Sequence, residues 1–280
     1  MAITINAISP VAVDLFGLEI RWYALAYIVA FIVGYWLFKK LAFGNDKSAT
    51  TKKYLDDLLT AVILGVIIGG RLGYVLFYNL PFFIANPLEI FMIWHGGMAF
   101  HGGLAGVLIA VLIFAWRQQK KQSPIKTAFG ILDVLAVIAP IGLLFGRIAN
   151  FINIEVMGRP TDGPLGVLFV DRYGVPIGDG IARHASPLYE AVLEGILLLI
   201  IMFALWRWTR LRERTGALSG IFAMLYAILR IFAELFREPD AQIGFLTSWG
   251  LTMGQLLSVA MFVAGAIVLA WSERKNKIKN

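Results

Sequence analysis

The sequence contains no cysteine and little charge, and both shortages limit what the chain can be. Among its 280 residues there are no cysteines, only three histidines, and 15% charged side chains. Without cysteine the chain has no disulfide, no thiolate metal ligand and no cysteine nucleophile of its own. Apolar residues make up 59% of the total instead, which indicates an integral membrane protein.

Apolar runs are the dominant pattern, and each has close to the ~20 residues that a helix needs to cross the hydrocarbon core of a bilayer. They cover residues 22–38, 58–78, 99–116, 131–153, 188–206, 218–237 and 251–271. The runs are continuously apolar, whereas the strands of a transmembrane β-barrel alternate over about ten residues. We therefore predict an all-α, polytopic integral membrane protein of about seven transmembrane helices.

Domain organisation is expected to be simple, because no internal repeat, low-complexity tract or linker divides the chain. We predict one transmembrane domain over residues 1–280. The one long connection, 154–187, is rich in Gly and Pro and is expected to form a small extracytoplasmic cap. The first apolar run is followed by charged residues, so it is expected to remain as a membrane anchor and not to be cleaved as a signal peptide.

Basic residues are placed unevenly among the connections. All eleven lysines follow the first, third or last apolar run, and four arginines follow the fifth. Short cytoplasmic loops are enriched in Lys and Arg, so this side is predicted to be cytoplasmic, with the N-terminus outside and the C-terminus in the cytoplasm. The net charge of +7 then reflects topology and attraction to anionic lipid, and no nucleic acid partner is expected.

Eight further arginines fall in the apolar runs or on the outer side. They are Arg21, Arg71, Arg147, Arg159, Arg172, Arg183, Arg230 and Arg237. A guanidinium suits bidentate contact with phosphate, but charges inside a membrane also pair with one another. Pairing is the main alternative for Arg230, since Glu234 follows four residues later on a helical stripe with Tyr226 and Arg237. Both readings stay open.

The segment 146–159, GRIANFINIEVMGR, places an arginine, two asparagines and a glutamate at the end of an apolar helix. An ionised arginine at the bilayer centre costs about 3 kcal/mol, so its presence indicates an anionic partner or a water-filled cavity. We predict a cavity open to the outer leaflet, lined by Arg147, Asn150, Arg230 and a histidine. An enzyme acting on a phospholipid and a transporter of an anionic solute or lipid headgroup both fit, and the lack of repeats favours the enzyme.

Histidines and glycines mark two further features. His95 and His101 lie in HGGMAFHGG, whose glycines allow close approach of a helix or ligand. Their spacing is not that of a helical metal pair, and Glu155 is the one carboxylate expected near the outer helix ends, so no metal is predicted. Glycines spaced along the run 58–78 are expected to pack closely against another helix, with Arg71 directed toward the polar centre.

The motifs RWYALAY, GGRLGYVLFYN, HGGMAFHGG, GRIANFINIEVMGRP, RHASPLYE and LRIFAELFREPDAQ follow one another along nearly the whole chain. In identity and order they resemble the motifs of the bacterial prolipoprotein diacylglyceryl transferase family. Two positions depart from the family pattern: Ala149 stands where glycine is common, and His95 where an acidic residue can occur.

The resemblance implies an enzyme of lipoprotein biosynthesis in the bacterial inner membrane. Its substrates would be phosphatidylglycerol and preprolipoprotein signal peptides with a lipobox cysteine. The diacylglyceryl group would be transferred to the cysteine thiol, leaving a thioether and releasing glycerol 1-phosphate. The absence of cysteine agrees with this, because the acceptor sulfur belongs to the substrate. No cofactor is implied.

The resemblance also assigns roles to residues. Arg147 and Arg230 would bind the lipid phosphate and the leaving group, and His101 would accept the thiol proton, with Glu234 or Glu155 as alternative bases. For several of the substrate-binding positions, structural support is an equally open role. The implied substrate-binding residues are Tyr23, Arg71, Asn150, Asn153, Glu155, Gly158, Tyr226, Glu234 and Arg237.

Overall fold

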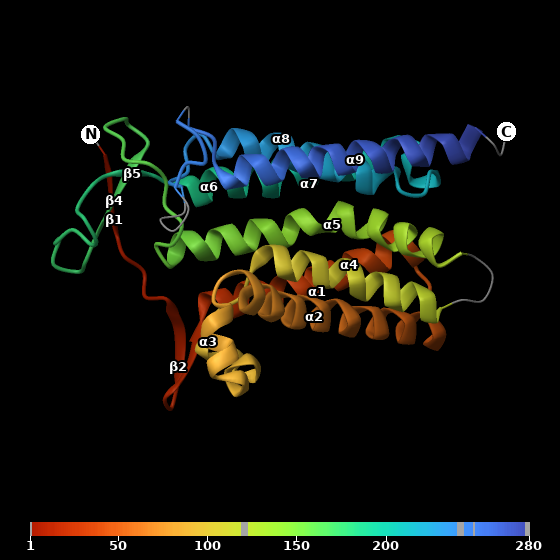
Figure 1. The fold of residues 1–280 in the computed structure, drawn as a ribbon, viewed down its shortest axis with the longest axis horizontal. Helices are drawn as coiled ribbons and strands as arrows, with labels where there is room; N and C mark the ends of the chain where they lie inside the picture. Colours follow the sequence, from red (N-terminus) through yellow and green to blue (C-terminus); the bar gives the residue numbers. More distant parts are fainter. Residues whose placement is uncertain (1, 119–122, 240–243, 249, 278–280) are drawn as a thin grey trace. The chain divides into compact units, whose positions relative to one another are not determined.

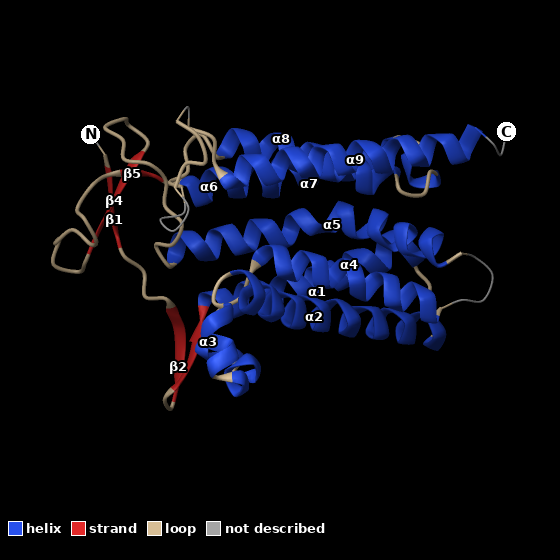
Figure 2. Cartoon of the chain, viewed as in Figure 1, coloured by secondary structure: helices blue, strands red, loops and turns tan. Residues whose placement is uncertain are grey.

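Long apolar helices dominate the computed structural model, which describes residues 2–118, 123–239, 244–248 and 250–277 (Figure 2). Five helices are long and apolar enough to cross a membrane, and two shorter apolar helices accompany them. Each predicted apolar run coincides with one of these helices, so the predicted polytopic all-α membrane fold is confirmed. Lys120, Lys121, Lys279 and the 240–242 end of the last motif lie outside the described residues.

The chain forms two compact units. One unit comprises residues 39–132, and the other comprises residues 1–38 and 133–280. The helices, in chain order, are α1 (Trp22–Phe43), α2 (Ala49–Phe77), α3 (Leu80–Ala85), α4 (Phe100–Arg117), α5 (Pro124–Ile152), α6 (Ser186–Glu190), α7 (Leu198–Trp208), α8 (Ala217–Ala233) and α9 (Met253–Lys277) (Figure 1).

Close packing of glycines joins α2 to α4 in the unit 39–132. A Cβ atom added at Gly65 would lie 2.7 Å from the carbonyl oxygen of Gly106, and one added at Gly73 would lie 2.6 Å from the Cα atom of Gly102. Only glycine permits such an approach of two backbones. The predicted glycine packing of this helix is therefore confirmed. Between α2 and α4 the chain forms α3 and two 3₁₀ turns, η1 (Pro87–Phe91) and η2 (Ile93–His95).

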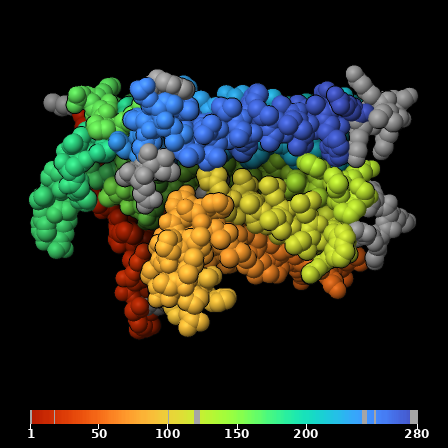
Figure 3. Space-filling view, viewed as in Figure 1, coloured from red at the N-terminus to blue at the C-terminus, as the bar shows by residue number. Residues whose placement is uncertain are grey.

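The larger unit contains most of α5, the continuous helical stretch from α6 to α7, and the pair α8 and α9. Asp133 of α5 is buried and caps α8: its carboxylate accepts hydrogen bonds from the backbone nitrogens of Gly216 at 2.6 Å and Ser219 at 2.8 Å. This pairing satisfies amide groups that have no partner within the helix. In Figure 3, α9 is seen along its length at the surface, and its side chains Leu256 and Ile267 are exposed, as expected for a lipid-facing helix.

Short strands occupy the segments outside the helices of this unit, a feature the sequence pattern did not predict. Strand β1 (Ile3–Asn6) pairs in parallel with β4 (Gly166–Val170), which pairs antiparallel with β5 (Arg183–His184). The segment 154–187 thus shares a small sheet with the N-terminal residues. A separate hairpin, β2 (Val11–Leu15) and β3 (Leu18–Arg21), leads directly into α1.

Candidate functional site

The helical stretch after the segment 154–187 carries two buried glutamates that define the centre of the site. Glu190 is the last residue of α6, and Glu194 lies in η3 (Ala191–Leu197), a π-helical segment between α6 and α7. Both side chains are fully buried. A π-helical segment inside an α-helix is uncommon and often marks a functional site.

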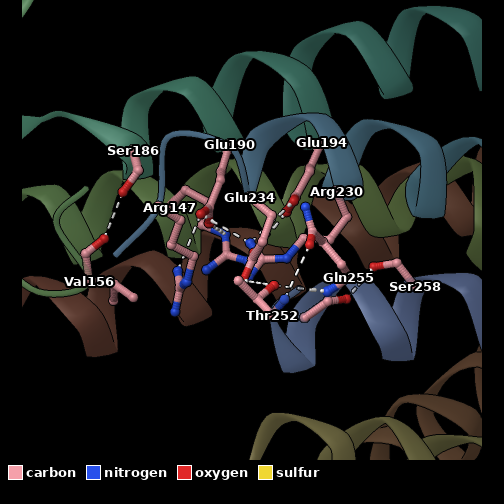
Figure 4. A network of polar contacts seen from close by, with 12 residues as sticks. Arg147, Val156, Ser186, Glu190, Glu194, Arg230, Glu234, Thr252, Gln255 and Ser258 are labelled. Atoms are coloured by element: carbon pink, nitrogen blue, oxygen red, sulfur yellow. Dashed lines mark hydrogen bonds and ion pairs between the residues drawn. The ribbon is translucent and has the colours of Figure 1, made fainter. Parts of the chain in front are cut away.

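Arg147 and Arg230 converge on these glutamates from two other helices (Figure 4), and Arg237, which follows α8, contacts one of them. Arg147 of α5 reaches Glu190 through Nε at 2.8 Å and Glu194 through Nη2 at 3.3 Å. Arg230 of α8 reaches the same two carboxylates through Nη1, at 3.0 and 3.5 Å. Arg237 also contacts Glu190, at 3.2 Å. Glu190 therefore binds all three guanidinium groups.

The network is completed by Glu234, whose Oε2 lies 2.7 Å from Nη2 of Arg230. The predicted pairing of Arg230 with Glu234 is thus confirmed. Three arginines face three glutamates, so the formal charges of these six side chains balance. The arginine side chains are 12–18% exposed, while Glu190 and Glu194 are 0% exposed. The accessible part of the network is therefore its positive part.

A second polar cluster lies at the end of α5. The amide nitrogen Nδ2 of Asn150 donates to Tyr23 Oη at 3.3 Å and to Glu155 Oε2 at 3.2 Å, and Asn153 Nδ2 donates to Glu155 Oε1 at 3.4 Å. Among the described residues, no donor reaches Asn153 Oδ1, although this oxygen is buried. The structure brings these four predicted site residues together.

Strained backbone holds Glu155 in this cluster. Its neighbours Ile154 and Val156 have φ angles of 57° and 59°. β-Branched residues rarely adopt this left-handed conformation, which costs of order 1–3 kcal/mol and is concentrated at functional sites. The carboxylate of Glu155 thus emerges from a turn that the surrounding structure must enforce.

Gly158 serves close packing in this region. Its amide donates to the carbonyl oxygen of His184 at 2.8 Å, and a Cβ atom at position 158 would lie 2.8 Å from His184 Cβ. The next residue, Arg159, donates from its backbone nitrogen to Phe236 at 2.9 Å and from Nε to the carbonyl of Arg237 at 3.0 Å. These contacts hold the backbone from which Arg237 enters the network.

Two predicted site residues belong to the unit 39–132. His101 lies in the first turn of α4 and is exposed. Arg71 is 5% exposed, and its guanidinium donates to five backbone carbonyls, including Ile90 at 3.0 Å and Met92 at 3.2 Å. The carbonyls all belong to the segment 89–97, so the observed contacts of Arg71 organise that segment.

The same segment borders a cavity of about 270 Å³ lined in part by Tyr74, Asn79 and Glu89. Glu89 pairs with His95, whose Nδ1 lies 2.8 Å from Glu89 Oε2. Across the described residues, no three histidine, aspartate or glutamate side chains are arranged to hold a metal ion.

Comparison with known proteins identifies the family. Residues 10–271 match the model of the prolipoprotein diacylglyceryl transferase family. The chain belongs to that family. The phosphatidylglycerol–prolipoprotein diacylglyceryl transferase of Azospirillum brasilense is 50% identical over 277 residues, covering 98% of both chains. The enzyme of the same name from Rhodospirillum rubrum is 47% identical over 274 residues, covering 98% of this chain and 95% of the relative.

Membership of the family confirms the resemblance inferred from the motifs and does not favour the transport alternative. It also agrees with the helices, which make the chain a multi-pass membrane protein.

Sequence reasoning missed Glu190 and Glu194. These two glutamates lie at the centre of the arginine network. The interpretation of Glu155 as the one carboxylate near the histidines is also wrong, because Glu89 lies 2.8 Å from His95. A signal for Glu190 and Glu194 was present: both occur, four residues apart, in the apolar run 188–206. Ionisable residues inside a membrane run are functional candidates by default.

Proposed function

We propose that this chain transfers the diacylglyceryl group of phosphatidylglycerol to the lipobox cysteine thiol of a preprolipoprotein, and that the arginine–glutamate network is the phosphate site. The sulfur forms a bond to the glyceryl carbon as the bond from that carbon to the phosphate oxygen breaks. The products are a thioether and glycerol 1-phosphate, and the thiol proton balances the charge of the released phosphate.

The observation that carries this proposal is the partial exposure of the guanidinium groups above fully buried counter-ions. Arg147 is 18% exposed and Arg230 is 12% exposed, whereas Glu190 is 0% exposed. An approaching phosphate therefore meets positive charge first. Because glutamates hold these arginines in place before the lipid binds, little reorganisation is needed as negative charge develops on the leaving group, and such preorganised stabilisation is usually the largest catalytic contribution.

His101 is proposed as the acceptor of the thiol proton. A cysteine thiol has a pKa of about 8.5, so an imidazole provides sufficient basicity near neutral pH. Glu155 is an alternative base, and its two oxygens already accept hydrogen bonds from Asn150 and Asn153.

The amide cluster around Asn150 is proposed to bind the polar part of the substrates. The buried, undonated Oδ1 of Asn153 supports this, since a hydroxyl of the glycerol headgroup would satisfy it. Tyr23, which accepts from Asn150, and Gly158 are included in this region. Tyr226, buried on α8 one turn before Arg230, is proposed to support the arginine.

The location that fits these assignments is the bacterial inner membrane, with the segment 154–187 as an extracytoplasmic cap over a single catalytic domain. The placement of lysines on one side of the topology supports an outside N-terminus and a cytoplasmic C-terminus.

The experiment that tests the function is mass spectrometry of a lipobox peptide incubated with the purified protein and phosphatidylglycerol. We expect the peptide to gain the mass of one diacylglyceryl group, and Arg147→Ala to lower the rate by about 100-fold or more. Arg172→Ala is the matched control, because Arg172 is exposed in the cap and stacks on Tyr173. If the wild-type protein adds no mass to an accessible thiol, the proposed reaction is excluded.

The role of His101 is tested in the same assay. His101→Gln should slow transfer at pH 7 and lose less as the pH rises, because the thiol then ionises without help. Equal loss at every pH would show that His101 does not accept the proton.

A further inference from the structure

Glu234 connects Arg230 to the beginning of α9. The residue follows directly after α8 and is 4% exposed. One carboxylate oxygen, Oε2, lies 2.7 Å from Nη2 of Arg230, and the other, Oε1, accepts a hydrogen bond from the hydroxyl of Thr252 at 3.0 Å. Figure 4 shows these three side chains close together, with dashed lines for the contacts between them.

The hydroxyl of Thr252 is held in place by a capping box. Thr252 Oγ1 accepts from the backbone nitrogen of Gln255 at 3.2 Å, and Gln255 Oε1 accepts from the backbone nitrogen of Thr252, also at 3.2 Å. This reciprocal arrangement fixes the start of a helix. Because the hydroxyl oxygen of Thr252 accepts a hydrogen bond from Gln255, the hydroxyl hydrogen of Thr252 is available to Glu234. The positive end of the helix dipole of α9 also favours a carboxylate at this place.

Gly254 provides the space that the carboxylate occupies. A Cβ atom at position 254 would lie 2.5 Å from Oε1 and 2.9 Å from Oε2 of Glu234, and 2.7 Å from its Cδ. All three atoms belong to the far end of a flexible side chain. A methyl group at position 254 would therefore displace the carboxylate and leave the backbone of α9 in place.

The position of Glu234 matters because Arg230 is oriented from two sides. Its Nη1 contacts Glu190 and Glu194, and its Nη2 contacts Glu234. Counter-ions on both terminal nitrogens fix the plane of a guanidinium, whereas counter-ions on one nitrogen leave it free to turn. Loss of the Glu234 contact would thus misdirect Arg230 while its charge remained.

We infer that Thr252 and Gly254 are positioning residues for the transfer reaction. They hold the carboxylate of Glu234 against the first turn of α9, and that carboxylate orients the guanidinium of Arg230 toward the phosphate. The inference rests on the proposed function for the role of Arg230. It adds a part of the chain, α9, that none of the predicted site residues occupies.

The test is a double-mutant cycle between Gly254→Ala and Glu234→Ala, measured as the rate of lipid transfer to a lipobox peptide. We expect each single variant to lose about 10-fold or more, the range for loss of a hydrogen bond to a charged group. In the Glu234→Ala background there is no carboxylate to displace, so Gly254→Ala should cause no further loss. The inference would be overturned if the rate loss of the double variant equalled the product of the two single losses. It would also be overturned if Gly254→Ala had wild-type activity.

The comparison variant is Gly265→Ala, also on α9. A Cβ atom there would lie 2.7 Å from the carbonyl oxygen of Gly220, a backbone atom. This variant should lower the unfolding temperature by the same amount with and without Glu234. Gly254→Ala should lower it only when Glu234 is present. These unfolding temperatures test the placement of the Glu234 carboxylate even if the wild-type protein transfers no lipid. Absence of lipid transfer by the wild-type protein would reject the proposed function alone.

Thr252 provides an independent readout. Thr252→Ser keeps both hydrogen bonds of the hydroxyl and should retain activity within about twofold, whereas the similarly shaped Thr252→Val should lose about 10-fold. If serine and valine behave alike, the hydroxyl does not position Glu234.

Discussion

Arg71 is a buried arginine and Arg230 a largely buried one, both on apolar helices, but their partners differ in kind. Arg71 donates to backbone carbonyls of the segment 89–97, whereas Arg230 contacts the carboxylates of Glu190, Glu194 and Glu234. Carbonyl oxygens satisfy hydrogen-bonding groups without neutralising a charge, and their positions depend on the fold of the loop. The contacts of Arg71 thus hold a segment in shape.

The partners of Arg230 indicate another purpose. Burying several charges together is seldom the most stable solution, because the desolvation of each ion offsets much of the attraction between them. A chain that keeps three arginines and three glutamates in one membrane region therefore uses them for something other than stability. The partners of a buried arginine, and not its burial alone, therefore distinguish an arginine that holds a backbone segment from one that serves a functional site.

The largest expected effect comes from the carboxylate that all three network arginines share. Glu190→Gln should destabilise the folded protein by about 3–5 kcal/mol, because it removes the carboxylate that all three arginines contact and leaves three guanidinium charges facing two carboxylates. Unfolding in detergent with increasing denaturant measures the change. Glu238→Gln is the matched control, since Glu238 forms an exposed pair with Arg183. Equal effects of the two substitutions would mean that the network is not a coupled unit.

The next largest effect comes from replacing Arg230 and Arg71 by lysine, which should reduce lipid transfer in one case and the stability of a segment in the other. Arg230→Lys should reduce lipid transfer by about 100-fold with little change in folded amount, because a lysine cannot reproduce the planar contacts of a guanidinium. Arg71→Lys should instead expose the segment 89–97 to protease, at a cost of about 1–3 kcal/mol for unsatisfied carbonyls. Loss of transfer in Arg71→Lys without a change in proteolysis would place Arg71 among the substrate-binding residues.

A smaller effect concerns left-handed backbone in the two units. Val156 is β-branched and has a φ of 59°, whereas the segment 89–97 uses Gly96, with a φ of 83°. Val156→Gly should raise the free energy of unfolding by about 1 kcal/mol through relief of strain. Gly96→Ala should lower it by a similar amount, since a Cβ at position 96 meets nothing within 4 Å among the described residues and only the backbone conformation opposes it. Calorimetry of both variants measures the contrast.

The smallest effect lies in the segment 154–187, where ion pairs are at least partly exposed. Arg183 donates to Asp179 at 2.6 Å, and this hydrogen bond holds the pKa of the Asp179 carboxyl below its usual value. Arg183→Gln should raise that pKa toward the ordinary range, as carboxyl NMR titration would show. Because the folded-state pKa is lowered, the contribution to stability is present above the unfolded pKa and is lost as the pH falls through the folded-state value. An unchanged pKa in the variant would mean that the pair does not persist in solution.

The membrane helices were predictable because their cause is local. Each apolar run from 22–38 to 251–271 carries its own hydropathy, and the pairing of Arg230 with Glu234 follows from a spacing of four residues on one helix. The strands were not predictable in the same way. β1 pairs with β4 across more than 150 residues of chain, and the residues of β1, ITIN, do not indicate which strand it pairs with.

Composition and order alone determined the class of this protein: a chain with 59% apolar residues and no cysteine is a membrane protein whose thiol chemistry must come from a substrate, and its motifs place it in one family. The tertiary structure decided which charges meet. Glu190 is at least 40 residues from Arg147 and from Arg230 in the sequence. Its carboxylate nevertheless lies 2.8 Å from the guanidinium of Arg147 and 3.0 Å from that of Arg230. The physical reason is that a membrane run specifies only that a charge needs a partner, whereas helix packing, the π-helical segment and the space at Gly254 specify which partner it finds.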